Sequence, residues 1–257
     1  YFSALLMTAP YAKNDVVIEV KGSLVSKRYV DMTTALMHQF GVMVENNNYK
    51  TFFVKSGQRY KATSYEVEGD ASAASYFFAA AAITSGKVRV VGIGNDSLQG
   101  DIHFVDVLKN MGCDVTMGGN WIEIKGNTLH GIDVDMSDMP DVVQTLAAVA
   151  VFARGKTRVR NVKNMRIKET DRIVAVVNEL RRIGIPTVEY EDGFEIEPSS
   201  PRPAEIETYD DHRMAMSFAL IGLRSHGISI KNPECVSKTF PDYFQRLEAL
   251  RDDYIRR

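Results

Sequence analysis

The stretch DASAASYFFAAAAI, residues 70–83, is one of three that decide the fold. It opens on an aspartate, continues as an almost wholly apolar run and ends close to a glycine. DVVQTLAAVAVFA (141–153) and DHRMAMSFALIGL (211–223) repeat this pattern at intervals of about 70 residues. An aspartate caps the free N–H groups at a helix start, and glycine suits the left-handed stop after a helix. Each run is therefore predicted to be a buried helix.

A strand, a second helix and, in two cases, a hairpin follow these runs. The predicted strands are KVRVVGI, KTRVRNV and GISIKN, and the predicted second helices are DIHFVDVLKNMG, DRIVAVVNELRRIG and PDYFQRLEALRDD. The hairpins DVTMGGNWIEIKG and TVEYEDGFEIEP alternate apolar and polar residues, as half-buried strands do. We therefore predict an α/β fold of repeated βαβαββ units, which form pseudo-threefold lobes with buried helices inside and sheets outside.

The repeats also predict the domain organisation. Residues 1–69 contain one unit without its first strand, and we expect them to form part of an N-terminal-type lobe. Residues 70–257 contain about two and a half units and should form most of a C-terminal-type lobe. Residue 1 is a tyrosine within a helix-like stretch, and the repeat pattern is incomplete at both ends. We therefore expect the chain to be a fragment of a longer protein.

The composition argues against several classes of protein. Of 257 residues, 45% are hydrophobic and 25% charged, and the net charge of -2 argues against a binder of duplex nucleic acid. Cys113 and Cys235 are too isolated for a disulfide framework, so a reducing compartment fits best. The five histidines show no metal-ligand spacing, and no apolar run approaches the roughly 18 residues of a membrane span. We expect no metal, nucleic-acid or membrane partner.

Cations gather at turns near the predicted helix entrances. Helix N-termini present free N–H groups and a positive potential, which favour anions. Four cations come from turns at the same end of the repeated units: Lys168, Arg172, Arg213 and Lys238. Bringing like charges together is costly unless anions neutralise them. The pattern therefore predicts a site for a substrate that carries phosphate and carboxylate groups.

Residues suited to proton transfer accompany these cations. Asp141, Glu169 and His212 are the candidates. Each also has a plainer interpretation, because Asp141 can be a helix cap, His212 a core histidine, and 164–172 a surface cluster of salt bridges. Ser26, in the turn GSLVSKRY, either binds a phosphate oxygen or caps the helix that follows. The residues taken one by one leave both interpretations open.

A set of motifs resembles a known family. KETDR (168–172), DDHRMAM (210–216), SKTFPDY (237–243), EGDASAASYF (68–77) and GDI (100–102) together are similar to the 5-enolpyruvylshikimate-3-phosphate synthases. The resemblance runs through essentially the whole chain, which looks like the C-terminal three-fifths of the family's sequence. It implies an enolpyruvyl transferase-like fold of two lobes, with the active site in the cleft between them.

The resemblance also implies an activity. The family transfers the enolpyruvyl group of phosphoenolpyruvate to the 5-hydroxyl of shikimate 3-phosphate and releases phosphate, in the shikimate pathway of aromatic amino-acid biosynthesis. It needs no cofactor. We expect the full-length enzyme to be a monomer of the cytoplasm, or of the plastid in a plant, with glyphosate as an inhibitor.

Site residues carry over from the family by matching motifs. Those expected to hold shikimate 3-phosphate are Ser26, Tyr29, Asp141, Asn164 and Lys168. Those expected to hold phosphoenolpyruvate are Arg172, Arg213 and Lys238, supported by Asp211 and His212. Asp141 is the candidate base for the 5-hydroxyl and Glu169 the candidate proton donor. The catalytic candidates are thus Asp141, Glu169, His212 and Lys238.

The chain departs from the family in what would precede Tyr1. The family's glycine-serine-lysine-serine segment, its asparagine-glycine-threonine loop, its first-lobe arginine and its paired serines are not in this sequence. We therefore expect no significant turnover from this chain alone. One alternative is a noncatalytic anion-binding lobe, or a half that needs the N-terminal segment as its complement. A UDP-N-acetylglucosamine enolpyruvyl transferase is less favoured, because neither Cys113 nor Cys235 lies in that family's proline- and arginine-rich loop.

Overall fold

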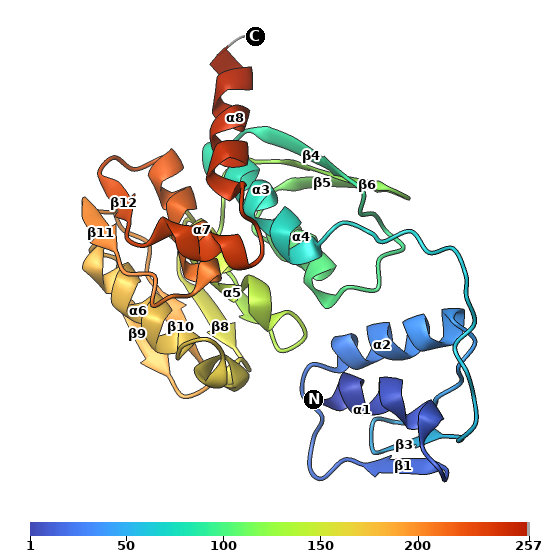
Figure 1. The fold of residues 1–257 in the computed structure, drawn as a ribbon. Helices are drawn as coiled ribbons and strands as arrows, with labels where there is room; N and C mark the ends of the chain where they lie inside the picture. The colour runs from blue at the N-terminus through green and yellow to red at the C-terminus, as the bar shows by residue number, and fades with distance from the viewer. Residues whose placement is uncertain (256–257) are drawn as a thin grey trace. The chain divides into compact units, whose positions relative to one another are not determined.

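The computed structural model of this chain describes residues 1–255, with side chains to residue 250. These residues form two compact units, shown in Figure 1. The first contains Tyr1–Glu68 and Ser97–Gly100, and the second contains Gly69–Asp96 and Asp101–Arg257. No helix in the described part of the chain has the length and apolar character needed to pass through a bilayer.

The first unit is a small sheet with two helices packed on it. The strands β1 (Val16–Glu19), β2 (Glu45–Asn47) and β3 (Thr51–Val54) form an antiparallel sheet in the order β1-β3-β2. The helices α1 (Phe2–Thr8) and α2 (Lys27–Gln39) bury Leu6, Val30 and Met37 against Phe52 and Val54. The short helix η1 (Ala9–Tyr11) follows α1.

Ser26 and Tyr29 lie at the start of α2. The backbone of Ser26 is left-handed (φ 55°, ψ 45°), and its side chain makes no capping hydrogen bond. The interpretation of Ser26 as a helix cap is therefore wrong. Lys27 stacks on the Tyr49 ring, with its Nζ 5.1 Å from the ring centroid. The hydroxyl of Tyr49 donates to the carboxylate of Asp31 at 2.8 Å, which ties α2 to the turn between β2 and β3.

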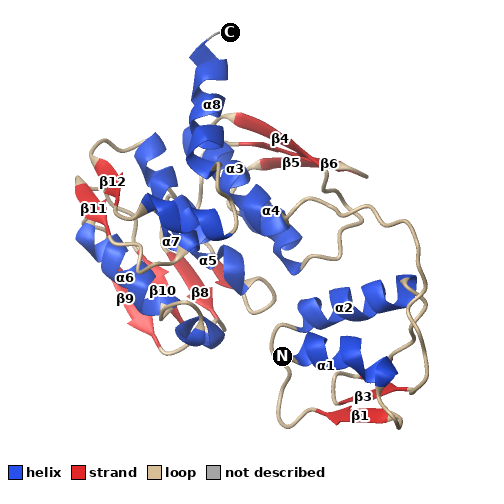
Figure 2. Ribbon diagram, in the orientation of Figure 1, coloured by secondary structure: helices blue, strands red, loops and turns tan. Residues whose placement is uncertain are grey.

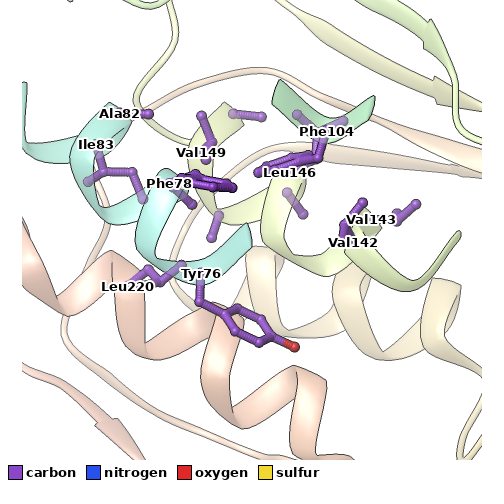
Figure 3. Packing of buried hydrophobic residues seen from close by; sticks show 14 of the residues in the cluster. Tyr76, Phe78, Ala82, Ile83, Phe104, Val142, Val143, Leu146, Val149 and Leu220 are labelled. Carbon is purple, nitrogen blue, oxygen red and sulfur yellow. The ribbon is translucent and has the colours of Figure 1, made fainter. Parts of the chain in front are cut away.

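Three buried helices form the centre of the second unit. They are α3 (Ala71–Thr84), α5 (Val143–Ala150) and α7 (His212–Ala219), in the three runs that the sequence marks as buried helices. Eleven of the fourteen residues of α3 and all eight of α5 are buried, because alanine and β-branched side chains leave no polar face for solvent. Figure 3 shows side chains from α3, α4, α5 and the segment after α7 gathered in this core.

Hydroxyl groups link the three buried helices. Ser75 of α3 lies 3.3 Å from the hydroxyl of Thr145 on α5, and Thr145 lies 3.3 Å from that of Ser217 on α7. The Ser75 hydroxyl donates to the carbonyl oxygen of Ser72 at 2.6 Å. The centre of the unit is therefore not wholly apolar.

Sheets and outer helices surround these helices, as Figure 2 shows. One sheet has the order β4-β6-β5, with β4 (Lys87–Val91), β5 (Asp114–Gly118) and β6 (Trp121–Lys125). A second has the order β7-β8-β10-β9, with β7 (Asp133–Asp135), β8 (Thr157–Arg160), β9 (Thr187–Tyr190) and β10 (Gly193–Ile196). A third pairs β11 (Ala204–Ile206) with β12 (Ile228–Ile230). The second helices of the three βαβαββ repeats are α4 (Phe104–Asn110), α6 (Arg172–Arg182) and α8 (Tyr243–Ile255).

The element order confirms the predicted repeat. The middle repeat of the second compact unit is β7-α5-β8-α6-β9-β10, a complete βαβαββ. In it β7 and β8 are parallel across α5, just as β11 and β12 are parallel across α7. Short helical turns lie beside the main helices: η2 (Gly100–His103), η3 (Pro140–Val142), η4 (Lys163–Ile167), η5 (Leu220–Leu223) and η6 (Pro233–Lys238). Three of these, η3, η4 and η6, carry or border the charged residues that the sequence singles out.

Candidate functional site

Aspartates begin the helices that carry the candidate site. Asp171 caps α6 by accepting from the backbone N–H of Val174 at 3.1 Å. Asp211 caps α7 by accepting from the N–H of Arg213 at 2.9 Å. The caps set where each helix starts, so they also set where the first residues of α6 and α7 direct their side chains.

Arg172, the first residue of α6, is the centre of the site. Its side chain is 1% exposed, and all three of its guanidinium nitrogens are bonded. Nε and Nη2 donate to the two carboxylate oxygens of Asp211 at 2.6 and 3.2 Å. Nη1 donates to Asp141 at 3.0 Å, and Nη2 lies 2.7 Å from Glu169. A buried guanidinium with three carboxylate partners is neutralised locally, which is the condition for its burial.

The remaining cations share the same carboxylates. Asp141 lies 3.5 Å from the Nζ of Lys168 and 3.3 Å from a guanidinium nitrogen of Arg213. The Nζ of Lys238 donates to Glu169 at 2.8 Å. The four cations therefore share carboxylates. Asp141 contacts Lys168, Arg172 and Arg213, and Glu169 contacts Arg172 and Lys238. We call this set the ion-pair network; its members are Asp141, Lys168, Glu169, Arg172, Asp211, Arg213 and Lys238.

The network is partly open to solvent. Lys238 is 57% exposed and Lys168 30%, whereas Asp211 is fully buried. The side chains of Asp141 and Arg213 lie between these extremes. Cations outnumber carboxylates in the network, and the exposed ammonium groups are free to turn toward an incoming anion at little cost.

Arg213 also contacts a residue that the sequence does not single out. Its Nη1 lies 3.4 Å from the hydroxyl of Tyr76, which is buried on α3. Burial lowers the pKa of Arg213, but Tyr76, Asp141 and Asp101 outweigh burial and raise it. Burial also raises the pKa of Tyr76 to about 12, so its hydroxyl stays protonated and is able to hydrogen-bond. A tyrosine within the apolar run of α3 is the sequence signal for this contact.

Glu169 is ionised in the ligand-free site. Partial burial raises its pKa, but the hydrogen bond from Lys238, a backbone hydrogen bond and the charge of Arg172 together lower the pKa to about 2. A carboxyl group with this pKa holds no proton at neutral pH. Glu169 therefore needs a change in its surroundings before it can act as a proton donor.

His212 is a buried, neutral histidine. It is 3% exposed, and its Nδ1 lies 3.7 Å from Asp211 without a hydrogen-bond partner among the described residues. Burial, followed by the charges of Arg213 and Arg172, lowers its pKa, although Asp211 and Glu169 oppose them. At neutral pH the imidazole is therefore uncharged. It is able to accept a proton, but it does not act as a cationic proton donor.

Asp101 is a further buried acid beside the network. It is 5% exposed, it accepts a hydrogen bond from the Ser72 hydroxyl, and its Oδ1 has no partner among the described residues. Burial raises its pKa to about 6, against the Ser72 hydrogen bond, while the charge of Asp141 raises it further and that of Arg213 lowers it. The GDI motif contains this residue, but its burial could not be read from the sequence.

The other predicted residues lie in two places. Asn164 is in η4, and its Oδ1 is buried without a hydrogen-bond partner among the described residues. Ser26 and Tyr29 belong to the first unit. Within residues 1–255, no group of three or more His, Cys, Asp or Glu side chains is arranged to hold a metal ion.

Comparison with known proteins identifies the family. Residues 1–247 match the family model described as EPSP synthase (3-phosphoshikimate 1-carboxyvinyltransferase). The chain is 54% identical over 251 residues to 3-phosphoshikimate 1-carboxyvinyltransferase of Nostoc sp., covering 97% of this chain and 59% of that protein. It is 52% identical over 252 residues to the protein of that name from Shewanella piezotolerans, with the same coverage of 97% and 59%.

Solved structures agree with this. An EPSP synthase from Acinetobacter baumannii superposes with a TM-score of 0.80 and 28% identity, covering 96% of this chain and 59% of that one. A second structure of the enzyme from this organism gives a TM-score of 0.78 and 30% identity, covering 93% and 57%. The chain thus spans about three-fifths of the length of the relatives it matches. On its sequence and its fold, the chain belongs to the EPSP synthase family.

Proposed function

We propose that the protein to which this chain belongs transfers the enolpyruvyl group of phosphoenolpyruvate to the 5-hydroxyl of shikimate 3-phosphate and releases phosphate. The observation that supports this most is the convergence of Arg172, Arg213, Lys168 and Lys238 on shared carboxylates. Phosphoenolpyruvate carries a carboxylate and a phosphate close together. A network with an excess of cations matches that pair of charges.

The reaction is an addition followed by an elimination. The 5-hydroxyl oxygen attacks C2 of phosphoenolpyruvate as a base removes the hydroxyl proton, and an acid adds a proton to C3. The product is a tetrahedral intermediate. The bond from C2 to the phosphate oxygen then breaks as C3 loses a proton. The sum is one enolpyruvyl ether and one inorganic phosphate.

Four residues would hold shikimate 3-phosphate. In our proposal Ser26 and Tyr29 bind its phosphate, while Asn164 and Lys168 bind its ring substituents. Asp141 is the base for the 5-hydroxyl. This role suits a carboxylate already oriented by Arg172 and Lys168, because an ordered base has less freedom to lose in the transition state.

Phosphoenolpyruvate would be held by Arg172, Arg213 and Lys238, whose charges stabilise its carboxylate and the departing phosphate. Asp211 and His212 support this end by orienting Arg172 and Arg213. We expect glyphosate, a small anion, to compete here. We place the reaction in the cytoplasm, or in the plastid if the source is a plant.

Anion binding would turn Glu169 into a proton donor. A bound carboxylate or phosphate draws Lys238 and Arg172 away from Glu169 and removes two contacts that depress its pKa. Burial, the largest influence on this pKa, then raises it. Calorimetric titration in two buffers of different ionisation enthalpy tests this, since binding of phosphoenolpyruvate should take up protons from the buffer. The phosphate of phosphoenolpyruvate also changes its protonation on binding, so the comparison is with Glu169→Gln, which should lack the part of the uptake that belongs to Glu169. Equal proton uptake by the two proteins between about pH 5 and pH 7 would count against Glu169 as the donor.

An alternative is that this chain by itself is a noncatalytic anion-binding half. The observation that favours it is the match to only 59% of the relatives' length. We expect no phosphate release from this chain with both substrates, and restored release when the remaining N-terminal segment of the family's sequence is added in trans. Robust release from the chain alone would refute the alternative. An inert mixture that still binds phosphoenolpyruvate would favour it.

The substrate that accepts the enolpyruvyl group is tested separately from phosphoenolpyruvate. Thermal unfolding of the mixture of the two segments should shift upward with shikimate 3-phosphate and stay unchanged with UDP-N-acetylglucosamine. The reverse result would favour a transferase acting on the nucleotide sugar. Binding of phosphoenolpyruvate to the 257-residue chain should depend on Arg213, because Asp141 is the one carboxylate paired with that guanidinium among the described ion pairs.

A further inference from the structure

The turn that precedes α7 has an unusual backbone. Tyr209 and Asp210 are consecutive residues with positive φ, 55° and 58°, and neither is a glycine. A side chain with a Cβ disfavours this left-handed region, and a bulky one such as tyrosine disfavours it most. The N–H of Asp211 donates to the carbonyl of Thr208 at 2.9 Å and closes the turn. Such a conformation persists only where the surrounding structure holds it.

Glu179 of α6 holds both sides of this turn. Its Oε1 accepts from the hydroxyl of Tyr209 at 2.8 Å, and its Oε2 accepts from the backbone N–H of Glu207 at 3.1 Å. Arg182, one turn along α6, donates to the same Oε2 at 2.8 Å. The carboxylate of Glu179 is fully buried, and hydrogen bonds to a buried charge are stronger than those between neutral groups.

The turn delivers three residues to the candidate site. Asp211 must present both carboxylate oxygens to Arg172 while it accepts from the N–H of Arg213. His212 and Arg213 follow directly in the first turn of α7. A small shift of the turn would therefore displace the Asp211–Arg172 pair and the guanidinium of Arg213 together. Displacements of about 1 Å at such sites are enough to impair binding and catalysis.

We propose that Glu179 is a positioning residue for the anion site: by clamping the left-handed turn 207–211 it orients Asp211, His212 and Arg213. Glu179 itself contacts none of the ion-pair network in the described hydrogen bonds and ion pairs. It acts through the backbone. The assignment of the site to an anion rests on the proposed function, whereas the clamping of the turn does not.

The variant Glu179→Gln tests the proposal with little change in shape. The glutamine amide carries no charge, so the hydrogen bonds from Arg182 and Glu207 lose their charge-assisted strength, and the Tyr209 hydroxyl must turn from donor to acceptor to keep its contact. The clamp is therefore weakened on both sides. The matched control is Glu205→Gln, on β11, where the glutamate is exposed. In calorimetric titrations with phosphoenolpyruvate, we expect E179Q to lose at least fivefold in affinity and E205Q to stay within twofold. A smaller loss in E179Q overturns the proposal.

A rescue experiment separates positioning from general destabilisation. In the E179Q background, Asp210→Gly removes the Cβ that disfavours the left-handed conformation, whereas Asp210→Ala removes the same carboxylate but keeps the Cβ. We expect the glycine variant to regain at least threefold in affinity and the alanine variant to regain none. Equal affinities for the two double variants would show that the turn is not what Glu179 controls, and would overturn the proposal.

Hydrogen exchange on the ligand-free chain makes the test independent of the proposed function. We expect faster exchange of the backbone N–H groups of Asp211 and Arg213 in E179Q, with wild-type exchange in E205Q. Unchanged exchange overturns the proposal even if the wild type binds no phosphoenolpyruvate. If E179Q does not fold, Tyr209→Phe removes one hydroxyl of the clamp, and the same accelerated exchange is expected in it; unchanged exchange counts against the clamp.

Discussion

The entrances of α3 and α7 are equivalent positions of the repeated unit, and they differ in what surrounds the aspartate. Asp70 accepts from the N–H groups of Ser72 and Ala73 and caps α3. Asp211 accepts from the N–H of Arg213 and, in addition, binds Arg172 through both carboxylate oxygens. The capping aspartate is common to these two entrances, whereas at the matching position before α5 the aspartate, Asp141, lies inside η3 and is not the N-cap residue. The buried arginine is an addition that the fold does not require.

The acids near the two entrances differ as well. Beside α3, Asp101 has no cation in direct contact among the described ion pairs, and burial raises its pKa to about 6. At the α7 entrance three carboxylates share four cations. The same backbone arrangement therefore supports a weak buried acid in one unit and a charged network in another. The difference lies in which side chains the neighbouring repeat supplies.

Removal of Arg172 should have the largest effect, because it makes the α7 entrance resemble that of α3. Arg172→Met leaves Asp211 buried without a counter-charge and removes a partner of Asp141 and Glu169. We expect a loss of about 4–5 kcal/mol in the free energy of unfolding. Urea denaturation measures it. The control Arg246→Met, at an exposed pair on α8, should cost less than about 0.5 kcal/mol.

Exchange of the two capping aspartates for asparagine compares the entrances directly. Asparagine caps a helix as well as aspartate does, so Asp70→Asn should change the free energy of unfolding by less than about 0.5 kcal/mol. Asp211→Asn keeps a cap but loses the charge paired with Arg172, and we expect a loss of about 3 kcal/mol. Equal losses in the two variants would contradict a role for Asp211 beyond capping.

Asp101 gives the α3 entrance a pH dependence of its own. Its folded-state pKa of about 6 lies above the ordinary value of 3.8 for an aspartate, so the folded state binds the proton more tightly than the unfolded state. Wild-type stability should therefore fall as the pH rises from about 4 to 6, by an amount on the order of 2–3 kcal/mol. Asp101→Asn should lack this component, which thermal unfolding from pH 4 to pH 7.5 would reveal.

Lys238 should have the smallest effect on stability, because it is more than half exposed. Lys238→Ala removes one hydrogen bond that lowers the pKa of Glu169, so that pKa should rise from about 2 toward its ordinary value of 4.5. The depressed pKa stabilises the fold above about pH 4.5, and this contribution is lost as the pH falls toward 2. The variant should cost under about 1 kcal/mol at pH 7, and NMR titration of the Glu169 carboxyl would follow the pKa.

The repeat and its buried helices could be predicted because the signals are local. An aspartate, an apolar run and a glycine mark each run within about 15 residues of sequence. The expected ends hold only in part: Asp70 and Asp211 cap α3 and α7, whereas Asp141 lies inside η3 and is not the N-cap residue of α5. The left-handed stop of α3 is Ser85, and α5 and α7 end before their glycines. Alternation in the hairpins is equally local. The convergence of the cations was predictable from their equivalent positions in the repeat, since equivalent turns of stacked units lie at the same end.

The partners in the site were not predictable, because tertiary packing selects them. Tyr76 and Arg213 are 137 residues apart, and nothing in either segment indicates their contact. The plain sequence EIETYDD contains no glycine, so it gives no sign of two left-handed residues held by Glu179. The low pKa of Glu169 likewise depends on Lys238, 69 residues away.

The hydroxyls between the buried helices have a consequence for the symmetry of the second unit. Ser75 gives its single proton to the carbonyl of Ser72, so toward Thr145 it is able only to accept. Thr145 must then donate to Ser75 and accept from Ser217. The protons therefore all point one way, from α7 through α5 to α3. The three repeats have similar backbones, but this chain of hydrogen bonds has a single direction. The three buried helices are therefore not equivalent in their polar contacts.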